Sequence, residues 1–382
     1  MKVSRMLRQL DFPLILLVGV LAVISIVAIS SATYTVKPTY PDKQMMWYLL
    51  GILFLVATLL FDYRLLSQGR LVYVLYGLGI VLLTMVWIPG LGVKVNGAQQ
   101  WVNLGGLQFQ PSEFMKIFLI LSMAKLLVDM EEIPIRGWRN IGKILGLFLL
   151  PFAVILKQPD LGTALVLMGI LGGMVLVAGV DWCILLTCVL AGAVLAGGVF
   201  ALYFTHKDWL EMILADHQIQ RIETFINPAS DPTGAGYQLT QSMIAVGSGQ
   251  LSGKGFHHGT QAQGNWIPEP HNDFIFAVFA EEFGFIGGSI LLCTFLFLIY
   301  RMVKVGISCE DRFGSYIIAG IVGMLVFQVF QNIGMTVGML PITGLPLPFV
   351  SYGGSSLLTG MVAVGLVLNI GMRQGGEYLF MQ

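Results

Sequence analysis

Charged residues are scarce in this chain. Asp, Glu, Lys and Arg together make up 11% of its 382 residues, whereas soluble globular domains carry about 25%. Hydrophobic residues reach 56% and the mean hydropathy is +0.81, which also excludes a disordered or collagen-like chain. The 21 basic residues balance 21 acidic ones, so the chain has no basic surface for nucleic acid. A polytopic membrane protein remains.

Cysteine pairs and nucleotide-binding motifs are absent as well. None of the four cysteines stands in a CxxC pair, so neither a zinc site nor a disulfide framework is indicated. Three residues separate Gly249 from Gly253, where a phosphate-binding loop of the Walker A type has four. The adjacent His257 and His258 are not expected to hold one metal ion, because neighbouring side chains on a loop point apart.

Long apolar runs predict an all-α membrane protein. A run of about 17 to 25 apolar residues reads as a spanning helix, because backbone groups in lipid must satisfy one another. We count ten such segments and expect one membrane domain over residues 1–382, with spans at residues 12–32, 45–61, 71–90, 114–130, 144–156, 161–180, 182–206, 283–300, 313–340 and 357–372.

The distribution of basic residues predicts the orientation. With ten spans both termini lie on one side, and thirteen of the 21 basic residues fall on that side, which the positive-inside rule assigns to the cytoplasm. The first span is expected to be retained, since no small-residue cleavage site follows it. Residues 207–272, between helices 7 and 8, are then a long extracytoplasmic loop.

The outward side carries the patterned polar segments. Residues 91–110, 157–160, 207–272 and 341–356 are longer or more polar than plain connectors need, so we look for the chemistry there. Between Leu340 and Ser356 stand three prolines and three glycines. An irregular backbone at membrane depth is tolerated only where it is buried in protein or lines a cavity. This segment is therefore expected to form a floor or wall of a binding site.

Pro111, Glu113 and Lys116 mark the start of the fourth span. Proline suits the first turn of a helix, and an acid there complements the helix dipole. Lys116 follows Glu113 at i+3, so the two can pair on one face. The alternative is that Lys116 presents its charge to an anionic head group. Trp101, just upstream, is either an interfacial anchor or packs against substrate.

Two outward carboxylates have both structural and chemical interpretations. Asp160 precedes a long helix, so it either caps that helix or accepts a proton or holds a cation. Asp273 opens an apolar run at the junction of water and hydrocarbon, where a charged group is by default functional; a helix cap is the alternative. Glu282 would lie about 180° round a regular helix from Asp273, so the two are not expected to form a catalytic pair.

Six ordered motifs resemble the SEDS family (shape, elongation, division and sporulation proteins), and within it the RodA branch more than the FtsW branch. They are GAQQWVNLG (97–105), QPSEFMK (110–116), QPDLG (158–162), DPTGAGYQ (231–238), PEPHNDFIFAVFAEEFG (268–284) and GLPLPFVSYGGS (344–355). Residues 259–263 carry the likeness to RodA. Ten helices with both ends inside is also the family's topology.

The resemblance implies a peptidoglycan glycosyltransferase that polymerises the lipid-linked precursor lipid II outside the cytoplasmic membrane, with a class B penicillin-binding protein as transpeptidase partner. Asp273 matches the family's essential acid. The resemblance also implies that the following positions are functionally sensitive or basic: Lys43, Trp101, Glu113, Lys116, Asp160 and Arg221. Asn272 and Pro270 depart from the family's usual residues. Lys43 replaces an arginine and so gives up bidentate recognition of phosphate or carboxylate.

Asp273 is accordingly predicted to be the general base of an inverting transfer. The departing diphosphate needs positive charge, from Lys43, Lys116 and Arg221 or from a divalent metal, Mg²⁺ or Mn²⁺, held by carboxylates. Two alternatives stay open. A lipid II flippase would place polar residues at all membrane depths, and Gln328, Gln331 and Asn332 are the residues most favourable to it, although such amides more often join helices. A scaffold for a penicillin-binding protein would tolerate loss of Asp273.

Overall fold

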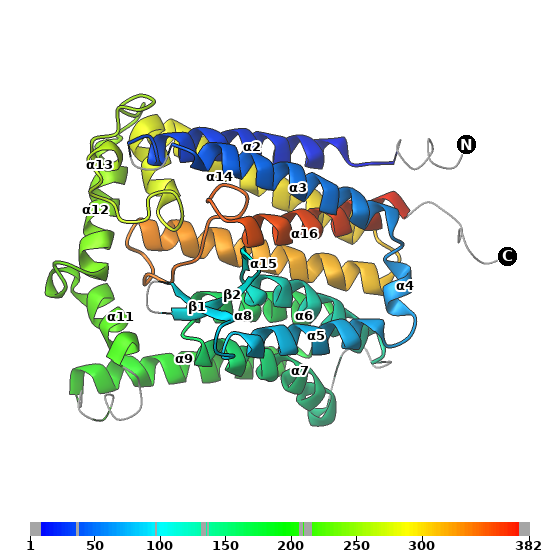
Figure 1. Cartoon of the computed structure of the whole chain (residues 1–382). Helices are drawn as coiled ribbons and strands as arrows, with labels where there is room; N and C mark the ends of the chain where they lie inside the picture. Colours follow the sequence, from blue (N-terminus) through cyan, green and yellow to red (C-terminus); the bar gives the residue numbers. More distant parts are fainter. Residues whose placement is uncertain are drawn as a thin grey trace.

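The computed structural model describes residues 9–35, 38–95, 98–130, 135, 137–205, 209 and 216–373. All ten predicted spans correspond to helices packed side by side in a bundle (Figure 1). Their bounds are α2 (Phe12–Ala32), α3 (Tyr40–Leu60), α5 (Leu71–Met85), α6 (Pro111–Val128), α7 (Trp138–Lys157), α8 (Leu161–Val177), α9 (Trp182–Thr205), α14 (Ile275–Ile307), α15 (Arg312–Thr336) and α16 (Gly354–Arg373).

The bundle has the character of a multi-span membrane protein, as the sequence predicts. Seven of its helices are long and apolar enough to cross a bilayer. Of the rest, α5 and α8 are shorter, and α6 carries Glu113, Lys116 and Lys125. Large apolar side chains such as Leu60 and Phe285 are more than two-thirds exposed, which suits contact with lipid. Inside, α8 and α15 approach so closely that a Cβ on Gly323 would lie 2.4 Å from the carbonyl oxygen of Gly169.

The two ends of the bundle differ. The start of α2 and the end of α16 lie at the same end (Figure 1), as an even number of spans requires; the termini themselves, residues 1–8 and 374–382, lie outside the described residues. Arg373 there pairs with Asp62 at 3.0 Å. The predicted loop 207–272 lies at the opposite end and contains helices of its own: α11 (Asp216–Ile226), η1 (Pro228–Ser230), α12 (Ala235–Ser248) and α13 (Thr260–Gln263).

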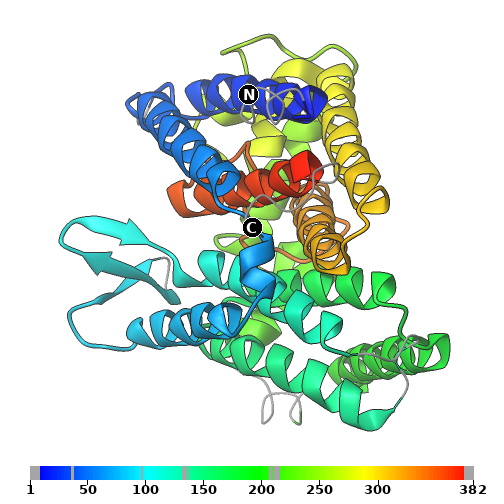
Figure 2. The ribbon, with the colours of Figure 1, turned by 90° about the vertical axis from the view of Figure 1, so that its right-hand side faces the viewer.

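A small antiparallel sheet was not predicted. Strands β1 (Gly92–Val95), β2 (Ala98–Leu104) and β3 (Leu107–Phe109) pair in the order β1-β2-β3 and project sideways from the helices (Figure 2). The strands are short and rich in glutamine, so they show little of the apolar alternation that announces a strand. The all-α prediction is confirmed for the bundle and incomplete for this outward segment.

The eighth span begins earlier than predicted. We expected it over residues 283–300, but α14 starts at Ile275 and bends at Gly284, where φ is 66°. Glycine tolerates this left-handed conformation. Beyond the bend, the backbone N–H groups of Phe285 and Ile286 donate to the carbonyls of Gln250 and Leu251, at 2.8 and 3.1 Å. The outward segment thus substitutes for the missing helical bonds and holds residues 275–283 as a separate helical stretch.

Candidate functional site

Asp160 caps α8 and ties it to α6. Its Oδ1 accepts a hydrogen bond from the backbone N–H of Thr163 at 2.9 Å, which confirms the capping role. The other oxygen, Oδ2, accepts from Nε2 of Gln110 at 3.1 Å, and Oγ of Ser112 lies 3.4 Å from it. The side chain is largely buried. The side chain is thereby fixed where the first turns of α6 and α8 meet.

Asp273 lies in the turn that leads into α14 and does not cap it. The N-cap residue is Phe274, and no side chain caps this helix. The residue is partly buried, and its Oδ1 is buried and has no hydrogen-bond partner among the described residues. Burial, followed by the charges of Glu269 and Asp160, raises the pKa of Asp273 to about 7, and the charge of Arg221 acts in the opposite direction. A carboxyl group with such a pKa and an unused oxygen is suited to accept a proton near neutral pH.

Arg221 supplies a positive charge close to Asp160 and Asp273. It projects from α11, is half-buried, and interacts electrostatically with both Asp160 and Asp273. Burial lowers the pKa of Arg221, while the two carboxylates raise it; arginine nevertheless stays charged in proteins. Three candidate residues from separate parts of the chain, Asp160, Arg221 and Asp273, therefore form one electrostatic group. Glu269 belongs to this group as well; it stands in the same motif as Asp273 but was not predicted as a site residue.

The segment after α15 packs against Asp273, as expected for a wall of the site. Gly344 has φ of 73°, and a Cβ on it would lie 3.5 Å from Oδ2 of Asp273. Phe349 also has a left-handed backbone, with φ of 64°, and its carbonyl accepts a hydrogen bond from the hydroxyl of Tyr48 on α3. Non-glycine residues in this conformation are rare and collect at functional sites.

Gly344→Ala is expected to destabilise the protein by about 1–2 kcal/mol, because the left-handed backbone brings a Cβ against its own carbonyl. Gly353→Ala is the matched control on the same segment: its backbone is not left-handed and the nearest atom to its new methyl group would lie 3.9 Å away. Thermal unfolding of both purified variants measures the difference. Equal melting temperatures would contradict the strain at Gly344.

Glu113 and Lys116 form the predicted ion pair. Nζ of Lys116 lies 2.7 Å from Oε2 of Glu113, and both side chains are almost fully buried. Neither of these two atoms has a hydrogen bond to any other described residue. The lysine charge is therefore neutralised inside the protein, next to the turn in which Ser112 approaches Asp160.

Lys116→Met is expected to destabilise the protein by about 3–5 kcal/mol, because it leaves the Glu113 carboxylate buried without a partner. A double variant with Glu113→Gln removes that charge and is expected to recover most of the loss. Melting temperatures of the wild type, both single variants and the double variant test the coupling. Additive effects of the two substitutions would show that the pair contributes no interaction energy.

Lys43 and Trp101 lie at the margins of this group. Lys43 is exposed in the first turn of α3, and its Nζ is 5.5 Å from the ring centre of Tyr40. The Tyr40 ring stacks on Tyr352 at 4.4 Å and meets His271 edge-on at 4.9 Å, which places Lys43 near the turn before Asp273. Trp101 is half-buried in β2, opposite Val93 of β1.

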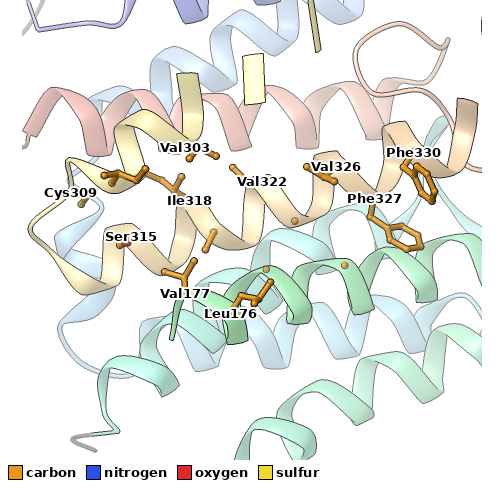
Figure 3. A pocket seen from close by; sticks show the side chains of 16 residues that line it. Leu176, Val177, Val303, Cys309, Ser315, Ile318, Val322, Val326, Phe327 and Phe330 are labelled. Carbon is orange, nitrogen blue, oxygen red and sulfur yellow. The ribbon is translucent and has the colours of Figure 1, made fainter. Parts of the chain in front are cut away.

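The described residues contain no metal-ligand cluster, and the cavity between α8, α14 and α15 has no charged lining, so neither feature is an alternative candidate site. In the described part of the chain no three His, Cys, Asp or Glu side chains lie together as a metal site, so we derive no step through a metal. A cavity of about 670 Å³ lies between α8, α14 and α15 and is lined by apolar side chains such as Val322 and Phe327 (Figure 3). No charged residue lines it.

Comparison with known proteins agrees with this arrangement. A sequence model of the family described as cell cycle protein, FtsW/RodA/SpoVE, matches residues 6–375. Peptidoglycan glycosyltransferase MrdB of Escherichia coli (strain K12) is 40% identical over 292 residues, 76% of this chain and 75% of the relative. Stage V sporulation protein E of Bacillus subtilis (strain 168) is 39% identical over 290 residues, again 76% and 75%.

A solved structure extends the match to the fold. A chain from a peptidoglycan synthase complex, described as coordinating polymerization and crosslinking, superposes with a TM-score of 0.80 and 32% identity, covering 96% of this chain and 99% of that one. The family model, the relatives and the structure all span most of the sequence. The chain belongs to the SEDS family of FtsW, RodA and SpoVE cell cycle proteins.

Proposed function

We propose that this chain is a peptidoglycan glycosyltransferase that joins lipid II disaccharide units into glycan strands on the outer face of the cytoplasmic membrane during cell elongation. The observation that carries the proposal is the carboxylate of Asp273, which is partly buried, has one oxygen without a hydrogen-bond partner among the described residues and interacts electrostatically with Arg221. The name of the Escherichia coli relative supports the same activity.

Chain growth requires one displacement with inversion. The 4-hydroxyl oxygen of the acceptor sugar attacks the anomeric carbon of the donor, a new O–C bond forms in the β configuration, and the α-linked bond to the lipid diphosphate breaks. Asp273 takes the hydroxyl proton, and undecaprenyl diphosphate leaves with the bonding electrons. A positioned base contributes about 10²- to 10⁴-fold to such a step. Because the active form is the carboxylate, the rate rises as the pH passes through the pKa of Asp273, about 7.

Arg221 is the cation we assign to the departing diphosphate, since it is the basic residue coupled to both Asp160 and Asp273. Arginine binds phosphate oxygens with two parallel hydrogen bonds. Lys43 is exposed at the edge of the same end and is proposed to add charge there, with Trp101 as a packing surface. The burial of the Lys116 charge against Glu113 favours a framework role for that pair.

The expected partner is a class B penicillin-binding protein that crosslinks the new strands. The related chain of the solved peptidoglycan synthase complex supports such a partnership. The decisive experiment incubates the purified full-length protein with lipid II, with and without its transpeptidase, and separates the products by strand length. Glycan strands support the proposal. Lipid II moved across vesicle membranes but left unpolymerised would indicate a flippase, and no change to lipid II in either condition would indicate a scaffold.

A further inference from the structure

Three consecutive backbone carbonyls in the turn containing Asp273 accept hydrogen bonds from residues outside that turn. The carbonyl of His271 accepts from the backbone N–H of Tyr352 at 2.9 Å. The carbonyl of Asn272 accepts from Oγ of Ser351 at 2.6 Å. The carbonyl of Asp273 accepts from Nδ2 of Asn332 at 2.8 Å. Every donor comes from α15 or from the segment that follows it, far away in the sequence.

Asn332 binds the wall of the site with the same amide group. Its Nδ2 also donates to the carbonyl of Leu345 at 2.7 Å, so its two N–H bonds join the Asp273 turn to the segment that carries Gly344. The side chain is fully buried, and its Oδ1 has no hydrogen-bond partner among the described residues. Leaving a buried acceptor without a partner costs free energy. The stabilising contacts of this side chain are therefore the two hydrogen bonds that its Nδ2 donates.

We propose that Asn332, with Ser351, is a positioning residue that sets the place of the Asp273 carboxylate relative to the wall of the site. This inference rests on the proposed role of Asp273 as general base. Neither residue touches the reacting atoms. They fix the backbone on which the base is carried, so the distance from Asp273 to the acceptor hydroxyl depends on α15. An error of about 1 Å in such a distance costs on the order of 10²-fold in rate.

The chain supplies two matched controls. Gln331, the neighbour of Asn332 in α15, is buried and donates Nε2 to the carbonyl of Pro341 at 3.0 Å; it holds the same segment to the same helix without touching the Asp273 turn. Asn369 on α16 is fully buried and also donates to two carbonyls, those of Thr58 and Phe61, at the cytoplasmic end. It reproduces the two donated hydrogen bonds of Asn332 away from the site, and its Oδ1 in addition accepts from Nε of Arg373 at 2.7 Å.

The test compares Asn332→Leu, Gln331→Leu and Asn369→Leu as purified full-length proteins polymerising lipid II. For Asn332→Leu we expect kcat to fall about 10- to 100-fold with KM for lipid II nearly unchanged. Release of the turn also admits water to Asp273, so the acid limb of its pH–rate profile moves to lower pH, while Glu269, Asp160 and Arg221 still face the carboxylate. Gln331→Leu and Asn369→Leu are expected to have lower melting temperatures than the wild type but an unchanged acid limb of the pH–rate profile.

Ser351 provides an independent arm should Asn332→Leu fail to fold. Ser351→Ala removes the hydroxyl that donates to Asn272, whereas Ser351→Thr keeps a hydroxyl and is expected to retain more of the rate. Wild-type kcat and acid limb in Asn332→Leu, or in Ser351→Ala where the first variant does not fold, would overturn the inference. So would an equal loss of kcat and an equal shift in Asn369→Leu. An Asp273→Asn protein with the wild-type rate would instead overturn the proposed role of Asp273 as general base.

Discussion

Asp273→Asn is expected to reduce polymerisation of lipid II by about 10²- to 10⁴-fold, the usual contribution of a positioned general base. The substitution preserves the shape of the side chain and removes only its ability to take a proton. Because no N–H in the described part of the chain binds Oδ1, an asparagine amide placed there meets no competing donor, and the fold is expected to be retained. The loss should therefore appear in kcat, with binding of lipid II retained.

Asp42→Asn is the matched control for this substitution. Asp42 is an exposed carboxylate in the first turn of α3, so the same chemical change there is expected to leave the rate unaltered. Initial rates measured on lipid II, together with melting temperatures, separate lost chemistry from lost folding. A folded Asp273→Asn protein that polymerises at the wild-type rate would remove Asp273 from the role of base.

The ten helices, and the starts of α6 and α8, could be predicted from the sequence because local rules set them. Apolar length locates each span, Pro111 starts α6, and Asp160 caps α8, all within one turn of the residues that cause them. The bend at Gly284 was missed for the opposite reason. Its compensating hydrogen bonds come from Gln250 and Leu251, more than thirty residues earlier in the printed chain, and no local pattern announces such a contact.

The members of the site could be selected from the sequence, but their grouping could not. Asp160, Arg221 and Asp273 stand in separate parts of the sequence, and only the fold shows that their charges act on one another. Asn332 illustrates the limit. A polar residue inside a span most often joins helices, whereas the carbonyls it binds lie 59 and 13 residues away, on Asp273 and Leu345. Every residue carries a backbone carbonyl, so the sequence does not indicate which residue accepts such a hydrogen bond.

The flippase alternative loses two of its three supporting residues, Gln331 and Asn332 but not Gln328, through the same contacts. Polar side chains inside spanning helices suggested a path across the membrane. Gln331 and Asn332 instead donate to the backbone carbonyls of Pro341, Asp273 and Leu345 near the C-terminal end of α15. Their amide groups stabilise the segment after α15 and the turn containing Asp273. This is a structural role rather than a path for a transported lipid.

Substitutions at Arg221 and Asp160 are expected to move the pH dependence of polymerisation in opposite directions. Arg221 lowers the pKa of Asp273 and Asp160 raises it. Without the arginine charge, as in Arg221→Gln, the pKa of Asp273 rises and the acid limb of the rate profile moves to higher pH. Without the aspartate charge, as in Asp160→Asn, the pKa falls and the limb moves to lower pH. Asparagine is as good an N-cap as aspartate, so α8 keeps its start.

The plateau at high pH separates this effect from stabilisation of the leaving group. Once Asp273 is fully ionised, any remaining loss in Arg221→Gln reports the missing charge on the diphosphate, and we expect about 10²- to 10³-fold, as for other groups that stabilise charge in a transition state. Lys94→Gln, which removes an exposed positive charge from β1, is the control and should change neither limb nor plateau. Rate profiles from about pH 5 to 9 bracket the titration of a group near 7. Shifts of the same sign in both site variants would refute the electrostatic group formed by Asp160, Arg221 and Asp273, because opposite charges cannot act alike on one carboxylate.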